Sequence, residues 1–245
     1  MLRADTLELW RFLKSQSALQ GFVLVGGSAL TLHIQHRVSE DLDFAWPGNQ
    51  LPRLRIDALL RLAAQAGFQL QRRDDPGSMD EFEIAGMNLH DYQQDFLVNG
   101  LVKLSFFAAD EALSRILGKT VETSVARVAT LDELFASKAL VAAQRSKTRD
   151  WFDLYVLMTR HGKTIEDMFE TFQTAGNEWQ FDTALQRLCS GKPSLHDEGY
   201  EQLLQDAPSL EVMTSFFRAQ RDAYEQRQAA LIASVVDVSS KRSSA

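Results

Sequence analysis

Two aspartates in an alternating segment are the residues of this sequence best suited to chemistry. Asp41 and Asp43 flank Leu42 and precede Phe44, an alternation of polar and apolar residues that is typical of a half-buried strand. Side chains two residues apart in a strand point to the same face, so both carboxylates are expected to project together. Adjacent carboxylates repel unless a cation lies between them, and Mg²⁺ takes one or two protein carboxylates together with phosphate oxygens. The pattern predicts a metal site, although two solvated acids at a strand edge would look the same.

A glycine turn lies upstream of these acids. The apolar run 22–25, Phe-Val-Leu-Val, predicts a buried strand that stops at Gly26 and Gly27. Ser28 follows and is placed to cap a helix that runs through 30–34. Backbone N–H groups at a helix start bind anions, and glycine lets the backbone approach a phosphate closely. The turn is therefore a candidate phosphate site, with a plain strand-to-helix connection as the alternative.

A second charged group lies on two helices predicted in the second half of the chain. Lys138 follows Leu134 by one helical turn, beside an apolar face, and Arg145 lies on the same side. Asp150 and Asp153 share a face of the next helix. Lys138 could extend along the surface or reach into a cleft. A network of salt bridges between the two helices would account for all four charged residues.

Both regions resemble one known family. Residues 24–44, LVGGSALTLHIQHRVSEDLDF, resemble the first motif of polymerase-β-type nucleotidyltransferases, two small residues followed by Asp-x-Asp. The sequence of this motif, with Arg37 and Ser39 before the aspartates, resembles the AbiEii/AbiGii toxin branch in particular. Residues 131–157, LDELFASKALVAAQRSKTRDWFDLYVL, are similar to the second signature of that branch. Two separate motifs in the right order are more specific than either one alone.

The resemblance implies an enzyme that transfers a nucleotide from an NTP to a hydroxyl group and releases pyrophosphate. In such an enzyme Asp41 and Asp43 bind Mg²⁺ or Mn²⁺, and Lys138 contacts the triphosphate. Asp150 and Asp153 would complete the catalytic set by orienting the lysine or the neighbouring basic residues. The residues implied to bind the nucleotide are Gly26, Gly27, Ser28, Ser39, Lys138, Arg145 and Arg149.

The same resemblance implies a biological role and its partners. It indicates the toxin of a toxin–antitoxin or phage-defence pair, with a cognate antitoxin and with RNA, such as a tRNA 3′ end, or a protein hydroxyl as acceptor. Residues 130–163 carry a net charge of +2, the only support for RNA contact in the sequence. The whole chain has a net charge of −7, which argues against a protein coated with nucleic acid.

One departure from the family pattern matters for the chemistry. Many nucleotidyltransferases supply a third metal-binding carboxylate from a later strand, which is expected here at 101–107. That segment contains Lys103 and Ser105 but no acid. Either Glu83 or Asp95 could replace the missing group. The missing acid also leaves a second hypothesis open. In it the chain is a catalytically silent domain that acts as a regulatory protein by binding an NTP or a protein partner.

The elements that must position these residues form an α/β (α+β) chain. We expect a mixed sheet with flanking helices at 1–128, a helical domain at 129–237 that completes the active-site cleft, and a flexible tail at 238–245. Beyond the first motif, we predict a helix at 51–66 and strands at 68–72, 82–85, 87–92, 96–98 and 101–107. Further helices are predicted at 165–172, 181–188 and 209–236.

The composition of the chain indicates the kind of protein and the cellular compartment in which this chemistry is expected. The chain has 245 residues and a hydrophobic fraction of 45%, enough to bury a core without stabilising metals or disulfides. Cys189 is the only cysteine, so no internal disulfide can form, which fits a reducing cytoplasm. No apolar run reaches the roughly 18 residues of a membrane span, and the first residues do not resemble a signal peptide. We therefore expect a soluble, cytoplasmic protein with no membrane partner.

Overall fold

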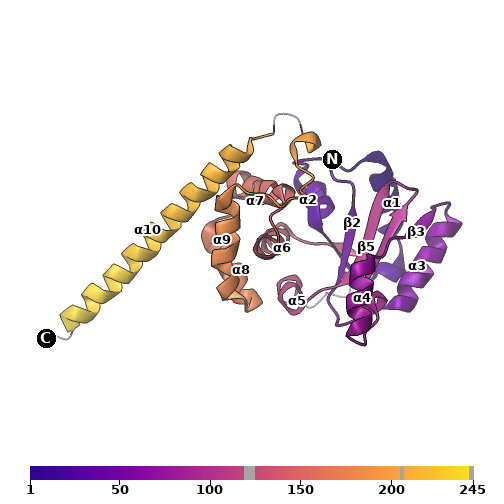
Figure 1. Cartoon of the computed structure of the whole chain (residues 1–245), viewed down its shortest axis with the longest axis horizontal. Helices are drawn as coiled ribbons and strands as arrows, with labels where there is room; N and C mark the ends of the chain where they lie inside the picture. The colour runs from indigo at the N-terminus through magenta and orange to yellow at the C-terminus, as the bar shows by residue number, and fades with distance from the viewer. Residues whose placement is uncertain (119–124, 205–206, 243–245) are drawn as a thin grey trace. The chain divides into compact units, whose positions relative to one another are not determined.

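The chain folds into two compact units (Figure 1). The computed structural model describes residues 1–118, 125–204 and 207–242, with side chains described as far as residue 234. The first unit, here called the sheet unit, contains Met1–Lys138 and two short later segments around Ala175 and Leu203. The second, the helical unit, contains most of the remaining chain. The chain passes from one unit to the other within helix α6 (Leu131–Gln144).

The described strands form one six-stranded mixed sheet, which confirms the predicted fold class. The strands are β1 (Val23–Val25), β2 (Leu42–Trp46), β3 (Leu70–Arg72), β4 (Gln93–Val98), β5 (Val102–Ala108) and β6 (Arg127–Val128). Their order across the sheet is β3-β4-β5-β2-β1-β6. β2 is parallel to β5 and antiparallel to β1, whereas β4 is antiparallel to both β3 and β5. The strands that carry the polar residues of interest are thus central or next to central.

A cluster of aromatic rings explains why these short strands are stable. Phe22, Phe44 and Phe106 come from segments far apart in the sequence, and all three are fully buried. The Phe106 ring lies 5.6 Å from the rings of both Phe22 and Phe44. Burying a side chain of this size contributes roughly 2–3 kcal/mol, so the cluster fixes β2 against β5 and the end of β1.

Helices flank the sheet, as the apolar periodicity predicts. Those of the sheet unit are α1 (Ala4–Leu13), α2 (Gly26–Ile34), α3 (Arg53–Gln65), α4 (Pro76–Ile84) and α5 (Glu111–Leu117). α1 buries Leu9, Trp10 and Leu13, which recur at helical spacing. α2 leaves the sheet directly from the end of β1 and contacts both β1 and β2. The glycine turn is therefore held against the two central strands.

Two strands predicted between α3 and β4 are wrong. The segment 82–85 lies in or beside α4, and the segment 87–92 holds a short 3-10 helix, Leu89–Asp91. The reason is local capping, because the Asp75 side chain accepts a hydrogen bond from the backbone of Ser78 and Pro76 occupies the first helical turn. These start signals outweigh the alternation of apolar and polar residues that suggested a strand.

The predicted capping role of Ser28 is also wrong. Helix α2 begins at Gly26, so Ser28 lies inside its first turn and Val25 occupies the cap position without a side-chain hydrogen bond. The Ser28 hydroxyl instead donates a short hydrogen bond to the carbonyl of Asp41. The strand after it likewise begins at Leu42, so Asp41 directly precedes β2.

The helical unit is a bundle, as expected for the region after the sheet. Its helices are α7 (Thr148–His161), α8 (Ile165–Ala175), α9 (Phe181–Ser190) and α10 (Leu210–Arg242), with a 3-10 turn at Glu178–Gln180. A further 3-10 turn, Glu201–Leu203, lies where the chain returns to the sheet unit. α10 packs against α7 and α9, and its C-terminal half extends beyond them (Figure 1). Helix α10 continues to Arg242, inside the segment predicted as a tail, and residues 243–245 lie outside the described residues. In the described residues, no helix is long and apolar enough to cross a membrane.

Candidate active site

Asp43 lies at the centre of a row of residues that crosses the sheet. On β2 it pairs with Val25 of β1 on one side and with Ser105 of β5 on the other. Ser105 in turn pairs with Asp95 of β4. Cross-strand partners point to the same face of a sheet, so the side chains of Asp43, Ser105 and Asp95 project together.

The glycine turn packs directly against the Asp43 carboxylate. Gly26 has a φ of +71°, in the left-handed region that favours glycine. A Cβ at this position would lie only 2.8 Å from Asp43 Oδ2. Any other residue would therefore be strained by its backbone and would push into the carboxylate. The turn and the acid form one local unit, as the first motif predicts.

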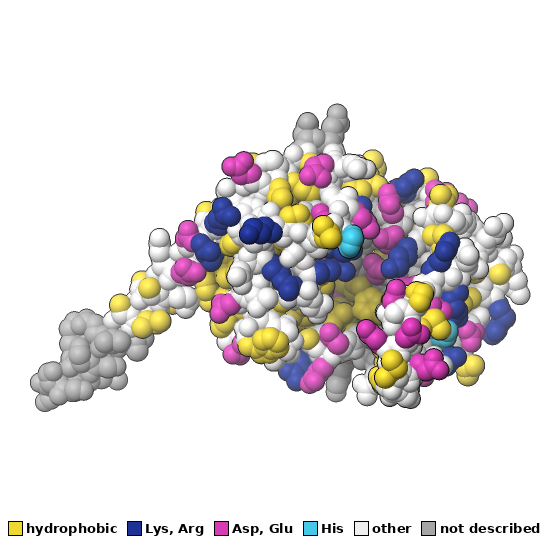
Figure 2. All heavy atoms as spheres, in the orientation of Figure 1, with side chains coloured by type: hydrophobic (Ala, Val, Ile, Leu, Met, Phe, Trp, Pro, Cys, Tyr) yellow, Lys and Arg dark blue, Asp and Glu magenta, His cyan; other side chains and the backbone are white. Residues whose placement is uncertain are grey.

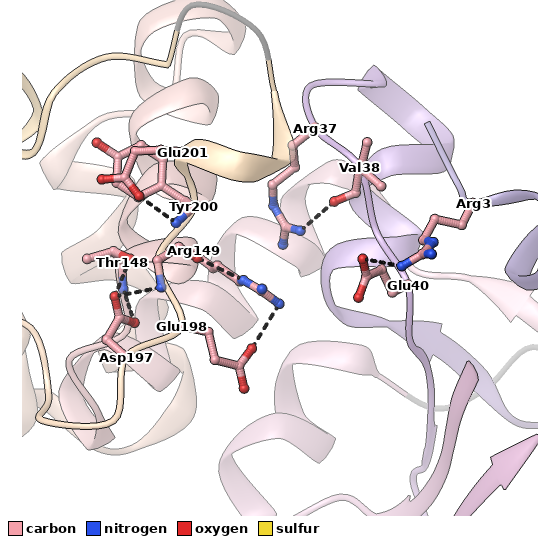
Figure 3. A network of polar contacts seen from close by, with 11 residues as sticks. Arg3, Arg37, Val38, Glu40, Thr148, Arg149, Asp197, Glu198, Tyr200 and Glu201 are labelled. Atoms are coloured by element: carbon pink, nitrogen blue, oxygen red, sulfur yellow. Dashed lines mark hydrogen bonds and ion pairs between the residues drawn. The ribbon is translucent and has the colours of Figure 1, made fainter. Parts of the chain in front are cut away.

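A buried arginine lies against the second glycine of the turn. A Cβ on Gly27 would meet Arg37 Nη2 at 2.4 Å and Ser39 Oγ at 3.1 Å. Arg37 is only 6% exposed, and its Nη1 donates a hydrogen bond to the Val38 carbonyl at 3.1 Å (Figure 3). The guanidinium thus brings positive charge close to the backbone of the turn, an approach that only glycine at this position allows. This arrangement suits an anion such as a phosphate.

Two serines predicted to bind the nucleotide hold the turn in place. The Ser28 and Ser39 hydroxyls are hydrogen-bonded to each other at 2.9 Å, and both residues are buried. Together with the bond from Ser28 to the Asp41 carbonyl, this contact ties α2 to the segment that leads into β2. Their direct contact with a nucleotide stays a prediction, whereas their effect on the position of Asp41 is visible in the structure.

The electrostatic environment of Asp43 favours a bound cation. Burial, together with the charge of the neighbouring Asp41, raises the pKa of its carboxyl from 3.8 to about 6. Lys103 and Lys138 oppose this effect, and Asp95 adds to it. A carboxyl that is hard to ionise in the empty protein would regain its charge beside a divalent cation.

The donor atoms around Asp43 fit a magnesium ion. Asp41 and Asp43 provide carboxylate oxygens, the ligands that Mg²⁺ prefers. Farther along the row, Asp95 Oδ1 and Ser105 Oγ are buried and have no hydrogen-bond partner. In the part of the chain that the structure describes, no group of three or more His, Cys, Asp or Glu side chains could hold a metal by itself. Such a set is not needed by Mg²⁺, which usually completes its shell with water and substrate phosphates.

A cavity opens on the β5 side of Asp43. It has a volume of about 680 Å³ and lies within the sheet unit. The residues that line it include Asp43, Asp95, Lys103 and Ser105 on the sheet, with Phe82 from α4 and Tyr92 from the segment just before β4. The rings of Phe82 and Tyr92 are in contact, with centroids 5.4 Å apart. This space, here called the Asp43 cavity, places an aromatic wall in the same pocket as the central carboxylate.

The basic and acidic residues of the second motif are divided between the two units. Lys138 is 7% exposed and is the last residue of the long first segment of the sheet unit. Its positive charge lowers the pKa of Asp43. In the helical unit, Arg145 Nε donates to Asp150 Oδ2 at 2.9 Å, which confirms a salt bridge between two of the predicted residues. Asp153 is fully buried on α7. Arg149 Nε donates to the Gly199 carbonyl at 3.0 Å.

A family comparison covers nearly the whole of this architecture. Residues 9–231 match the model of the nucleotidyl transferase AbiEii toxin family, which is assigned to type IV toxin–antitoxin systems. The chain belongs to the AbiEii family. This confirms the family predicted from the two motifs, and both motifs lie inside the matched region.

One relative and two solved structures are similar to this chain over most of its length. The chain is 23% identical over 224 residues to an uncharacterized protein of Aquifex aeolicus (strain VF5), covering 91% of this chain and 97% of that protein. It resembles the crystal structure of JHP933 from Helicobacter pylori with a TM-score of 0.52 and 20% identity, over 95% of this chain and 99% of that one. A second H. pylori structure, of a provisionally assigned nucleotidyltransferase, gives a TM-score of 0.51 and 18% identity over 93% and 96% of the two chains.

Sequence reasoning missed two parts of this candidate site. Arg37 was recognised only as one residue of the first motif, without a role of its own. Its position against Gly27 depends on how the segment before β2 folds back over α2. The aromatic wall was missed because Phe82 was assigned to a strand. The Asp75-Pro76 start signal could have revealed helix α4, but the sequence alone could not bring Phe82 to the same cavity as Asp43.

Proposed function

We propose that this AbiEii-family chain is a Mg²⁺-dependent nucleotidyltransferase that transfers a nucleotide from an NTP to a hydroxyl group and releases pyrophosphate. The observation that carries this proposal is the position of Asp43. Its carboxylate packs against a glycine turn on one side, lines a cavity on the other, and has a pKa raised to about 6 by burial and by Asp41. An ion pair with a purely structural role would not place its acid between an anion site and an open cavity.

The residues of the sheet unit divide the work of holding the NTP. The backbone at Gly26 and Gly27 approaches the phosphates, and the Arg37 guanidinium offers charge at the same turn. Lys138 neutralises the outer phosphate oxygens as a point charge. Mg²⁺ or Mn²⁺ held by Asp41 and Asp43 would supply positive charge to the phosphoryl group in transfer.

The proposed biological role is that of a toxin with a cognate antitoxin, in a toxin–antitoxin or phage-defence system. Family membership supports this role, and an RNA 3′ end, such as that of a tRNA, is the favoured acceptor over a protein hydroxyl. The support for RNA is local, because residues 130–163 carry a net charge of +2 in a chain of net charge −7. On the face drawn in Figure 2, basic side chains are interspersed with acidic ones. Binding is therefore expected to use a small number of defined contacts.

A second candidate is a catalytically silent member of the family that binds an NTP or a protein partner. The observation that favours it is Ser105, which occupies the position beside Asp43 where a third carboxylate is expected. Transfer activity would exclude this candidate, whereas binding of an NTP and Mg²⁺ without turnover would support it.

Label transfer tests the two candidates against each other. Each of the four α-labelled NTPs is incubated with the protein, Mg²⁺, and total bacterial RNA or protein. We expect label in RNA with one or more nucleotides, and a loss on the order of a thousandfold in Asp43→Asn, as for removal of a central charge-stabilising group. Asp5→Asn, a change of an exposed acid on α1, is the matched control and should retain activity. A folded protein that labels nothing would favour the silent domain.

A further inference from the structure

We propose that the Asp43 cavity binds the acceptor, and that it takes the 3′-terminal nucleoside of a single-stranded RNA. This inference rests on the proposed function, because it identifies the second substrate of the same site. It assigns the acceptor-binding surface to Phe82 and Tyr92, and the group that receives the acceptor proton to Asp95.

The order of the strands separates the donor side of Asp43 from the acceptor side. On the β1 side lie Gly26 and Gly27. The proposed function places the triphosphate, and hence the leaving pyrophosphate, at this turn. On the β5 side lie Ser105 and then Asp95, which face the cavity. An attacking oxygen in an in-line displacement enters opposite the leaving group. The attacking hydroxyl must therefore approach from the β5 side, through the Asp43 cavity.

The chemistry of the cavity wall fits a nucleobase. Helix α4 buries none of its side chains, and Phe82 is only partly buried beside the ring of Tyr92. The same wall carries the amide side chains of Asn49 and Gln93. Aromatic rings stack on the face of a base, whereas amide groups hydrogen-bond to its edge. A serine or threonine acceptor would use neither feature, so the lining favours a nucleoside over a protein hydroxyl.

The charges of the cavity select which end of the RNA can enter. Three acids, Asp43, Asp95 and Asp110, line it together with a single described cation, Lys103. Such a surface repels a phosphate group but tolerates an uncharged sugar and base. An RNA that ends in a free 3′ hydroxyl should therefore enter, whereas one that ends in a 3′ phosphate should be rejected.

Asp95 is positioned to accept the proton of the entering hydroxyl. It is 7% exposed and lines the cavity, and its Oδ1 accepts no hydrogen bond. Lys103 Nζ lies 3.9 Å from this oxygen, and Gln93 Nε2 donates to Oδ2 at 2.5 Å, which orients the carboxylate. In the reaction, the hydroxyl proton passes to Asp95 and the oxygen forms a bond to the α-phosphorus. The bond from that phosphorus to the bridging oxygen breaks, and its electron pair leaves with pyrophosphate.

Binding of RNA in the absence of NTP tests the pocket independently of catalysis. The probe is a short single-stranded RNA with a 5′ fluorophore, followed by fluorescence anisotropy in Mg²⁺. Phe82→Ala should weaken binding by about tenfold, as expected for loss of one stacking partner. Phe82→Tyr should restore it. The matched control is Ile84→Ala, which truncates another apolar residue at the end of the same helix that is 87% exposed and does not line the cavity.

The 3′ end and the Asp95 carboxylate provide two further readouts. The same RNA with a 3′ phosphate should bind the wild-type protein several-fold more weakly. Asp95→Asn should lower kcat for transfer by about a hundredfold while the KM for NTP stays unchanged, because Asp95 lies on the acceptor side.

The outcomes separate this inference from the proposed function. If transfer occurs but Phe82→Ala and Ile84→Ala bind RNA alike, the cavity is not the acceptor site and only this inference fails. Label in protein alone would also overturn it. If Phe82→Ala loses RNA binding in a protein that transfers nothing, the pocket assignment stands and the proposed transferase function fails.

Discussion

Buried acids are stabilised differently in the two units. In the helical unit, Asp150 is 2% exposed and accepts a hydrogen bond from Arg145 at 2.9 Å. Its neighbour Thr148 donates to Asp197 from both its backbone and its hydroxyl (Figure 3). In the sheet unit, Asp43 stands beside Asp41 with its pKa raised to about 6. In the helical unit the buried acid accepts a hydrogen bond from a protein cation, whereas in the sheet unit Asp43 stands beside a like charge that disfavours its charged form.

This difference separates a structural use of charge from a use that requires a ligand. A buried carboxylate matched by protein donors contributes to folding and is costly to remove. A carboxylate crowded by a like charge is a cost in the empty protein, which a bound cation removes. The comparison therefore predicts opposite responses to mutation in the two units, and the following experiments test it.

The largest effect concerns the pH dependence of stability in the metal-free protein. Burial and Asp41 raise the folded-state pKa of Asp43 from 3.8 to about 6, with Asp95 adding to the shift and Lys103 and Lys138 opposing it. Between these values the folded state binds more protons, so the free energy of unfolding falls as pH rises. The loss should reach about 3 kcal/mol by neutral pH. Urea unfolding in EDTA across this range should show it, and Asp43→Asn should flatten the slope. Equal slopes in the two proteins would contradict the account.

In the helical unit, removing an acid should be destabilising at neutral pH. Asp150→Asn takes away the charge that Arg145 contacts inside the fold, and we expect a loss of about 2 kcal/mol in the free energy of unfolding. Glu198→Gln is the control, because Glu198 is exposed and its pair with Arg149 should contribute less than about 0.5 kcal/mol. Urea denaturation at neutral pH measures both. A neutral or stabilising Asp150→Asn would remove the contrast between the units.

A smaller effect, on the affinity for the nucleotide, is expected from a substitution at the glycine turn. Gly27→Ala would bring a Cβ within 2.4 Å of Arg37 Nη2 and force the guanidinium to move. The affinity for a fluorescent NTP analogue in Mg²⁺ should fall by about tenfold, which corresponds to about 1.4 kcal/mol. Gly77→Ala is the matched substitution, because its Cβ would meet nothing closer than Asp75 Oδ2 at 3.3 Å. Equal affinities in the two variants would indicate that the turn does not hold the nucleotide.

The smallest effect is expected at an exposed pair close to the site. Arg3 Nη1 contacts Glu40 Oε1 at 2.9 Å, beside Asp41, but both side chains are largely accessible (Figure 3). Arg3→Ala should change the free energy of unfolding by less than about 0.5 kcal/mol and leave NTP affinity unchanged. Thermal unfolding and nucleotide titration check this. A larger loss would mean that the segment before β2 depends on this pair and that the position of Asp41 is less robust than its buried hydrogen bonds suggest.

The local part of the site could be predicted from the sequence. An apolar run, two glycines and an alternating Asp-x-Asp segment each carry their own structural signal, and they appear as β1, the start of α2 and the start of β2. The order of sheet and helices followed from the change in apolar periodicity near residue 130. These features depend on neighbours in the chain, which is why pattern reasoning recovers them.

The remainder of the site depends on contacts between distant segments. Asp95 was named only as one of two possible replacements for the missing acid. The pairing of β4 with β5 now places it in register with Ser105, whereas Glu83 lies exposed on α4. Strand register is set by tertiary packing, which no single segment reveals. The same holds for Phe82, whose alternating neighbours resembled a strand although a capped helix forms there.

Thermal unfolding of Asp43→Asn, measured at neutral pH with and without Mg²⁺ and NTP, tests the central claim most directly. We expect the variant to be more stable than the wild-type protein in EDTA, because a buried like charge is removed. We also expect Mg²⁺ and NTP together to raise the unfolding temperature of the wild-type protein and to raise that of the variant much less. A variant that is less stable in EDTA and is stabilised by Mg²⁺ and NTP as strongly as the wild type would show that Asp43 is a structural acid.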